Sequence, residues 1–254
     1  MTFFEHEAAA RRYARARPYF HPQVVSRIER TVASGAPIGR ALDVGCGTGQ
    51  STLALRRIAT EVIGLDVSPA MLAVAPRASG LRFVAGSAER LPLVSGAFGL
   101  VTVALAFHWL DRDRFLPEAR RVLAASGWLV LYANAFTGTM REESSFADWF
   151  RTAYLRRFPS PPRDRRPLTA AAAARHGLRL VGEESYTNDV VFSAAELAVY
   201  LTTQSNVIAA VEEGAESPDA AVSWLRAELA PLVRAPSGTF RFGGAIRYFR
   251  PSDA

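Results

Sequence analysis

Short apolar runs recur between residues 41 and 132, and longer mixed segments separate them. Five of these runs have the length and composition of buried strands, at 41–44, 62–65, 81–84, 100–106 and 128–132. The segments between them are long enough for helices. Strands that alternate with helices predict an α/β fold of parallel βαβ units, in which ligands bind at the carboxyl ends of the strands. Functional motifs are therefore expected directly after each strand.

The rest of the chain contains further helices and strands around a proline-rich connection. The sequence FPSPPRDRRP, residues 158–167, cannot form a regular helix or a central strand, because proline lacks the amide hydrogen that both need. We predict helices at 5–17, 22–34, 142–157, 194–201 and 220–232. We predict a last strand at 239–249 and one long or bent strand that includes 178–181 and 189–192.

Length and composition favour one domain. With 254 residues, of which 49% are hydrophobic, the chain can bury one large core. We expect a single domain over residues 1–254, with a core at about 38–135 and 177–250, a helical N-terminal lid at 1–35 and a helical insertion at 136–176. No run is long and apolar enough to cross a membrane, and the N-terminal residues lack the apolar stretch of a signal peptide. We expect a cytoplasmic protein without a membrane partner.

Two other classes of site are disfavoured by composition. Cys46 is the only cysteine, and no Cys/His cluster has the spacing of a zinc site, so we expect no metal. The net charge of +6 suggests nucleic-acid binding, but all 30 basic residues are arginine and most are scattered along the chain. Together with abundant alanine, this fits biased codon usage better than a phosphate-binding face. We expect a small-molecule partner, and the sequence leaves the oligomeric state open.

The strongest local motif is LDVGCGTG, residues 42–49, placed where a strand should turn into a helix. Glycines at 45, 47 and 49 allow positive φ and a close approach of the backbone to a ligand. The start of the following helix would offer N–H groups to a polar or anionic ligand. A nucleotide-type cofactor fits this loop, and the alternative is a tight turn that binds nothing.

Asp66 ends the second predicted strand, within VIGLDVSPAML. A carboxylate at this position can accept hydrogen bonds from both hydroxyls of a ribose. The alternative is a helix cap, but Ser68 and Pro69 already supply cap and first-turn residues. The glycine pattern is G-x-G-x-G and has Gln50 where the dinucleotide fingerprint has its third glycine, so NAD is the second choice of cofactor.

Five segments carry a resemblance to a known family. They are LDVGCGTGQS, VIGLDVSPAML, FVAGSAERLPL, FGLVTVALAFHWLD and RVLAASGWLVLY, whose order and spacing over residues 40–132 are similar to the successive motifs of class I S-adenosylmethionine (SAM)-dependent methyltransferases. AARRYARARPYF, residues 9–20, and HWLD further resemble a small-molecule subgroup that includes trans-aconitate methyltransferases. The resemblance implies a Rossmann-like fold: a mostly parallel seven-stranded sheet with helices on both faces and helical lid elements. It also implies SAM as cofactor and a small-molecule methyl acceptor, with a carboxylate or another oxygen nucleophile as candidates.

The resemblance also assigns roles to individual residues. It implies that Asp43 and the loop residues Gly45, Cys46, Gly47 and Gly49 hold the methionine end of SAM, and that Asp66 holds the ribose. Val67 and Met71 should flank the adenine, although ordinary core packing is an alternative for either one. Ser87 and Ala88 should meet the adenine edge, and Leu105, Ala106 and His108 should line the path to the sulfonium.

The chain departs from the family pattern at two positions. Ser87 stands where the family usually has an acidic residue, and Gly99 stands where it typically has the aspartate of FDLV. Loss of one charge-assisted hydrogen bond to adenine would weaken binding by about ten- to a hundredfold, before a serine or water replaces part of it. We expect weaker cofactor binding, not its abolition.

Methyl transfer from a sulfonium is an in-line displacement, for which the protein must chiefly align the acceptor and exclude water. His108 is the candidate base for an acceptor that must lose a proton, and the alternative is that it only shapes the pocket wall. Tyr13 and Arg17, one helical turn apart, and the segment YLTTQSN at 200–206 are expected to form a lid and pocket rim. Tyr13 and Arg17 are also candidates for cofactor binding, with Arg17 able to reach a carboxylate of SAM or of an acidic acceptor. Two other functions remain open: a SAM-binding protein that does not transfer methyl groups, and an NAD-dependent oxidoreductase.

Overall fold

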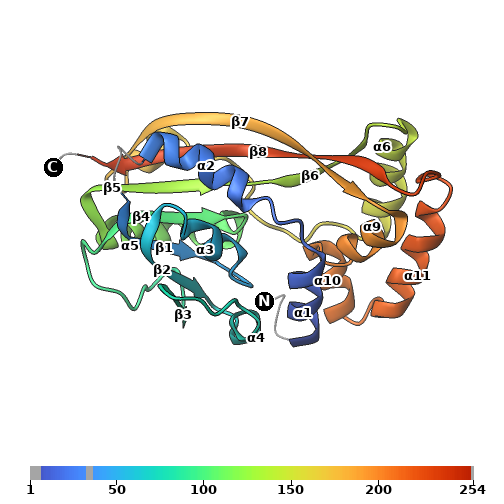
Figure 1. Ribbon diagram of the computed structural model, residues 1–254, viewed down its shortest axis with the longest axis horizontal. Coiled ribbons are helices and arrows are strands. Elements are labelled where there is room, and N and C mark those ends of the chain that lie inside the picture. The colour runs from blue at the N-terminus through green and yellow to red at the C-terminus, as the bar shows by residue number, and fades with distance from the viewer. Residues whose placement is uncertain (1–6, 33–36, 253–254) are drawn as a thin grey trace. The chain divides into compact units, whose positions relative to one another are not determined.

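The computed structural model describes residues 7–32 and 37–252, which form two compact units. We name them the sheet unit, with Tyr19–Ala133, Arg163–Ser185 and residues 244–252, and the helical unit, with residues 7–18, Asn134–Pro162 and Tyr186–Gly243. Two long strands, β7 (Leu178–Phe192) and β8 (Gly238–Pro251), contribute residues to both units (Figure 1).

The sheet unit contains five parallel strands. They are β1 (Ile38–Val44), β2 (Ala59–Asp66), β3 (Leu81–Ala85), β4 (Phe98–Ala104) and β5 (Leu123–Tyr132), which lie in the order β3-β2-β1-β4-β5. The second half of β8 pairs antiparallel with β5, and β7 pairs with β8. The strand order reverses between β1 and β4, the switch point at which such sheets bind ligands. This is the Rossmann-like arrangement that the sequence predicts.

Helices cover both faces of these strands. Leu42 and Val44 of β1 lie in one buried cluster with Phe115 and Ala119 of α5 (Arg112–Val122). Side chains alternate along a strand, so Asp43 points the other way, toward Ser51 and Thr52 of α3 (Gln50–Leu55). The remaining helical segments of the unit are α2 (His21–Val32), α4 (Pro69–Ala73), the 3₁₀ turn η1 (Phe107–Trp109) and α8 (Ala170–Ala174).

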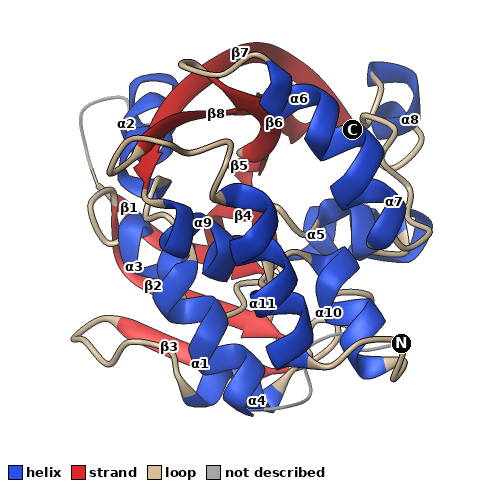
Figure 2. Ribbon diagram, turned by 90° about the vertical axis from the view of Figure 1, so that its right-hand side faces the viewer, coloured by secondary structure: helices blue, strands red, loops and turns tan. Residues whose placement is uncertain are grey.

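The helical unit is built around an aromatic core. Phe146, Tyr154, Tyr200, Phe240 and Phe242 are all buried in one cluster. The helix α9 (Ala194–Leu201) packs on both α1 (Glu7–Ala16) and α11 (Pro218–Leu229), as Figure 2 shows. The other elements of this unit are β6 (Ala135–Met140), α6 (Ser145–Trp149), the π-helical turn η2 (Phe150–Tyr154), α7 (Leu155–Arg157) and α10 (Ser205–Glu212).

The structure adds elements that the sequence pattern does not predict. β6 is an extra strand that pairs antiparallel with the first half of β8, so the described residues contain eight strands where the resemblance implied seven. Its sequence AFTGTM has no continuous apolar run. α8 and α10 are also additional, and Ser34, the predicted end of the second helix, lies outside the described residues. No helix in the described ranges has the length and hydropathy of a membrane span.

Candidate functional site

The glycine loop joins β1 to α3 at the switch point. Gly45, Gly47 and Gly49 have φ of 67°, 54° and 77°. At two of them space is also limiting, because a Cβ on Gly45 would lie 2.5 Å from that of Ala106, and one on Gly49 would lie 2.8 Å from the Phe83 ring. Gly45 N–H donates to the Leu65 carbonyl across 2.8 Å, which ties the loop to β2. The fold therefore requires glycine at 45 and 49 before any ligand is considered.

Asp43 is fully enclosed beneath this loop. Its carboxylate accepts hydrogen bonds from the hydroxyls of Ser51, Thr52 and Thr102 at 2.5, 2.8 and 2.9 Å. Burial raises the pKa of Asp43 to about 6, although these three hydrogen bonds oppose the shift. Because the carboxylate has no exposed surface, its interactions in this structure fix the start of α3 under the glycine loop.

Cys46 is a buried member of the loop. Burial, together with the charges of Asp43 and Asp66, raises the pKa of its thiol well above the ordinary value. The side chain is therefore a protonated, apolar part of the loop near neutral pH, and only its backbone is suited to polar recognition.

Asp66 lies at the end of β2, beside the glycine loop. Its carboxylate accepts hydrogen bonds from Gly47 N–H at 2.8 Å and Ser68 N–H at 2.9 Å. Burial raises its pKa, and both backbone hydrogen bonds act in the opposite direction. Ser68 caps α4 by accepting from Met71 N–H, so Asp66 is not needed as the cap. One carboxylate thus connects the ends of β1 and β2.

The predicted adenine-flanking residues differ in exposure. Val67 is 58% exposed, which leaves apolar surface open beside Asp66. Met71 is buried and its Cε lies 3.9 Å from the position of a Cβ on Gly47, so it supports the loop from inside. Val67 is the better placed of the two to contact a planar ring.

Ser87 and Ala88, which follow β3 after Gly86, differ in their surroundings. The Ser87 hydroxyl bonds to the Glu89 carboxylate, whose other oxygen accepts from Asp111 N–H at 3.1 Å. An acidic group thus lies two residues beyond the position where the family usually has one. Ala88 is buried in the core of the sheet unit, and its methyl group packs among apolar side chains.

The end of β4 is sharply bent. Leu105 has φ of 56°, and its N–H donates to the Tyr132 carbonyl across 2.9 Å. Ala106 then packs against Gly45, and His108 follows in η1. Nε2 of His108 lies 3.3 Å from Nη1 of Arg163, and burial and nearby arginines lower the pKa of His108 to about 4.

Gly99 has a structural explanation in the sheet. The β4–β5 register shifts between Phe98 and Leu100, so Gly99 sits at an irregularity of the strand pair. A Cβ there would lie 3.1 Å from Ile38 of β1. A larger residue at this position would require the Ile38 methyl group to shift by a few tenths of an ångström, which glycine avoids.

Tyr13 and Arg17 lie in the helical unit. The Arg17 guanidinium stacks over the rings of Tyr13 and Tyr200, at 4.5 and 5.3 Å from their centres, and donates to the Thr203 carbonyl across 2.7 Å. The two segments assigned to a lid therefore contact one another. Whether they close over a cofactor stays a prediction.

In the segment 200–206, which the sequence assigns to the pocket rim, several polar groups are engaged within the fold. Thr202 and Thr203 are buried and donate to the carbonyls of Val199 and Tyr200. Asn206 is buried in α10, where it donates to the Phe158 carbonyl and contacts the Tyr154 hydroxyl. The fold itself uses these groups, and the end of the segment already belongs to α10, which begins at Ser205.

Sequence reasoning missed several residues that complete the site. Ser51, Thr52 and Thr102 could have been found from the rule that a carboxylate predicted inside a strand needs hydrogen-bond donors. Glu89 could have been found from its position near Ser87. The contact between Arg163 and His108, which are 55 residues apart in the chain, had no such signal. Among the described residues, no cluster of His, Cys, Asp and Glu side chains could hold a metal ion.

Comparisons with known proteins agree with this arrangement. A family model described as a methyltransferase domain matches residues 42–131. An uncharacterized methyltransferase of Mycobacterium tuberculosis is 38% identical over 124 residues, which cover 48% of this chain and 49% of that protein. The chain thus spans about half the length of this relative.

Two further proteins match more of the chain. A malonyl-[acyl-carrier protein] O-methyltransferase of Geobacter sulfurreducens is 35% identical over 188 residues, 69% of this chain and 68% of that protein. The solved structure of a putative type II methyltransferase from Anaeromyxobacter dehalogenans matches with a TM-score of 0.71 at 23% identity, over 92% of this chain and 97% of that chain. The fold is thus shared over almost the whole chain, and the chain belongs to the class I SAM-dependent methyltransferase family.

Proposed function

We propose that this protein transfers the methyl group of SAM to a small-molecule acceptor. The observation that carries the proposal is the hydrogen bond of 2.8 Å between Gly47 N–H and Asp66, which joins the glycine loop to the carboxylate expected to hold a ribose. Family membership supports the same cofactor. A carboxylate or another oxygen nucleophile is the acceptor chemistry we propose, as in the trans-aconitate methyltransferase subgroup that the sequence resembles.

The residues at the ends of β1 and β2 fit SAM. Gly47 carries no side chain and has open space around it, since the nearest atom to its Cβ position is Met71 Cε at 3.9 Å, and Asp66 has a carboxylate oxygen beside its N–H. Val67 presents exposed apolar surface suited to an adenine ring. When bound, SAM would supply an electrophilic methyl group on a sulfonium.

The chain's own residues would align the acceptor and exclude water. Asp66 would exchange its bond to Gly47 for bonds to the ribose hydroxyls, which frees the Gly47 N–H toward the ligand. The Ser87 hydroxyl, held by Glu89, would contact the adenine edge in place of the usual acidic residue. Leu105 and Ala106, on the bent end of β4, would limit the space beside the methyl group.

The test is turnover of SAM labelled in its methyl group against a panel of metabolites that contain carboxylates, hydroxyls or amines. We expect label transfer to at least one carboxylate or hydroxyl compound and formation of S-adenosylhomocysteine in equal amount. Tight binding of S-adenosylhomocysteine with no transfer to any class would favour the noncatalytic alternative. Binding of NAD in its place would contradict the cofactor assignment.

A further inference from the structure

Arg163, His108 and Trp109 form a cluster within the sheet unit. The Arg163 guanidinium carbon lies 5.0 Å from the centre of the Trp109 ring, and its Nη1 lies 3.3 Å from Nε2 of His108. Arg163 belongs to the proline-rich connection, whereas His108 and Trp109 form part of η1. Two ring side chains from one element therefore hold a partly buried arginine from another.

The direction of the Arg163–His108 hydrogen bond is fixed by chemistry. A guanidinium can only donate, so Nε2 of His108 must accept, and the imidazole is neutral. In agreement, burial and then the charges of Arg163, Arg165 and Arg112 lower the pKa of His108. The nitrogen that would take a proton from an acceptor already accepts a bond from a cation, which makes His108 a poor base.

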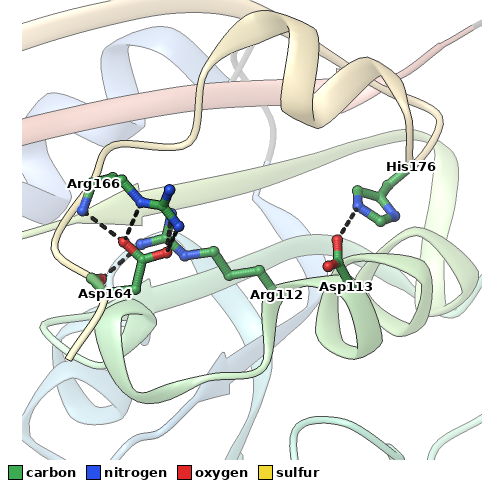
Figure 3. Close-up of polar contacts among 5 residues, drawn as sticks. All are labelled: Arg112, Asp113, Asp164, Arg166 and His176. Carbon is green, nitrogen blue, oxygen red and sulfur yellow. Dashed lines mark hydrogen bonds and ion pairs between the residues drawn. The ribbon is translucent and has the colours of Figure 1, made fainter. Parts of the chain in front are cut away.

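The surroundings of Arg163 are rich in positive charge. Asp164 is shared by two other arginines: Arg112, at 3.4 Å between Nη1 and Oδ2, and Arg166, whose Nε and Nη2 lie 2.9 and 2.8 Å from its two oxygens (Figure 3). Asp113, the next residue of α5, faces His176 at 3.1 Å instead (Figure 3). Residues 112 and 163–166 thus bring together four guanidinium groups and one carboxylate.

This charge lies next to the proposed methyl-transfer site. Ala106, which packs against Gly45 of the cofactor loop, is two residues before His108. The cluster is therefore attached to the carboxyl end of β4, on the side of the switch point where ligands bind. An anion beside β4 would meet a guanidinium that is already oriented.

We propose that Arg163 binds a carboxylate of the methyl acceptor, and that His108 is a positioning residue that holds Arg163, not the base. The proposal rests on the proposed function, which it makes more specific. A planar guanidinium pairs well with a carboxylate, and one held by neighbouring side chains loses less entropy when it does so.

The chemistry of a carboxylate acceptor needs no base. An ionised carboxylate releases no proton when it takes the methyl group: its oxygen forms the new O–C bond while the C–S bond of the donor breaks and leaves its electron pair on sulfur. This agrees with a neutral His108 whose accepting nitrogen is occupied by Arg163.

The test follows the His108 ring by NMR through a pH titration, with and without citrate at constant ionic strength. A carboxylate bound to Arg163 offsets its positive charge, so citrate should raise the pKa of His108 in the parent protein. In Arg163→Gln the pKa should rise without citrate, and citrate affinity should fall by about tenfold or more. Arg166→Gln is the matched control, because Arg166 pairs with Asp164 on the same connection, and it should respond to citrate like the parent.

Two variants separate positioning from base chemistry. His108→Gln retains an acceptor for Arg163 and should keep citrate affinity within about threefold of the parent, whereas His108→Ala should lose about tenfold. Equal citrate binding by all variants, or binding of inorganic phosphate but not citrate, would overturn the carboxylate site. As a control, circular dichroism of each variant should give the spectrum of the folded parent.

SAM itself carries a carboxylate, which is the alternative partner for Arg163. A second comparison distinguishes the carboxylate of SAM from that of the acceptor. S-adenosylhomocysteine and 5′-deoxy-5′-methylthioadenosine differ by the amino-acid end, so the ratio of their affinities reports its recognition. We expect the ratio of the affinity for S-adenosylhomocysteine to that for 5′-deoxy-5′-methylthioadenosine to be the same in the parent and in Arg163→Gln. A ratio that falls only in the variant would assign Arg163 to the cofactor and overturn the inference, whereas failure of the parent to bind either compound would count against the proposed function alone.

Discussion

Gly45 and Ala106 leave no space between the cofactor loop and the end of β4: a Cβ added to Gly45 would lie 2.5 Å from the Cβ of Ala106. Gly45→Ala should therefore displace the loop and lower the affinity for S-adenosylhomocysteine by about tenfold or more. Gly96 has nearly the same φ, 68°, but open space around it. Gly96→Ala should show the same backbone strain of roughly 1–2 kcal/mol with unchanged affinity. Calorimetric titration of both variants measures this, and equal losses would mean that backbone strain, not the contact, controls binding.

Asp66 should determine cofactor affinity. Asp66→Ala removes the acceptor of the Gly47 and Ser68 N–H groups and the expected ribose contacts, so S-adenosylhomocysteine should bind about ten- to a hundredfold more weakly. Asp66→Asn keeps one acceptor oxygen and should lose less. Calorimetric titration measures the affinities, and circular dichroism checks that each variant is folded. Parent-like affinity in a folded alanine variant would remove Asp66 from the site.

The buried Asp43 should make stability fall as pH rises from about 4 to about 6. Its pKa is raised in the folded state, from 3.8 to about 6, so the folded protein binds the proton more tightly than the unfolded chain in this window. The free energy of unfolding should decrease by roughly 3 kcal/mol from this group alone. Urea unfolding of the parent and Asp43→Asn at several pH values isolates the effect as a difference. If the free energies of unfolding of the parent and the variant change with pH in parallel, Asp43 titrates with an ordinary pKa.

Asn206 should contribute to stability and not to binding. Asn206→Ala leaves the Phe158 carbonyl and the Tyr154 hydroxyl without this partner in the core of the helical unit, and should destabilise the protein by about 1–3 kcal/mol. Affinity for S-adenosylhomocysteine should be unchanged. A stable variant with weakened binding would restore the pocket role that the sequence suggested.

The proposed lid can be tested by hydrogen exchange. If the segments joined by Arg17 and Thr203 close over the cofactor, residues 7–17 and 195–210 should gain protection when S-adenosylhomocysteine binds. Protection should also rise around Gly45 and Asp66, which serves as the internal control. A change only at those two residues would show that the lid segments are not part of the response.

The sequence predicts best those strands whose residues are buried on both faces of the sheet. β1, β2, β4 and β5 have continuous apolar runs because both of their faces are covered, and the long β7 and β8 fall where the sequence places them. β6 could not be predicted, because AFTGTM mixes polar and small residues and gains its pairing only from the distant β8. Boundaries also differ: β1 begins at Ile38, three residues before its apolar run, where Ile38 and the exposed Arg40 still pair with β2.

The residues of the candidate site also differ in how well the sequence predicts them. The glycine loop and Asp66 are recognisable from the sequence because backbone conformation and strand position restrict the residue types there. The partner of His108 is not, because Arg163 arrives from a connection whose path depends on prolines and on packing against Trp109. Contacts between residues far apart in the chain depend on tertiary structure that local patterns do not encode.

Leu105 also has a consequence for how this protein could evolve. It is the one residue other than glycine with positive φ in the part of the chain that the structure describes, and such a conformation costs on the order of 1–3 kcal/mol. Leu105→Gly would relieve part of this strain, so a screen that selects only for heat resistance should be able to find it. The same change would let the end of β4 vary in shape, and selection for thermal tolerance and selection for turnover would then act on this position in opposite directions.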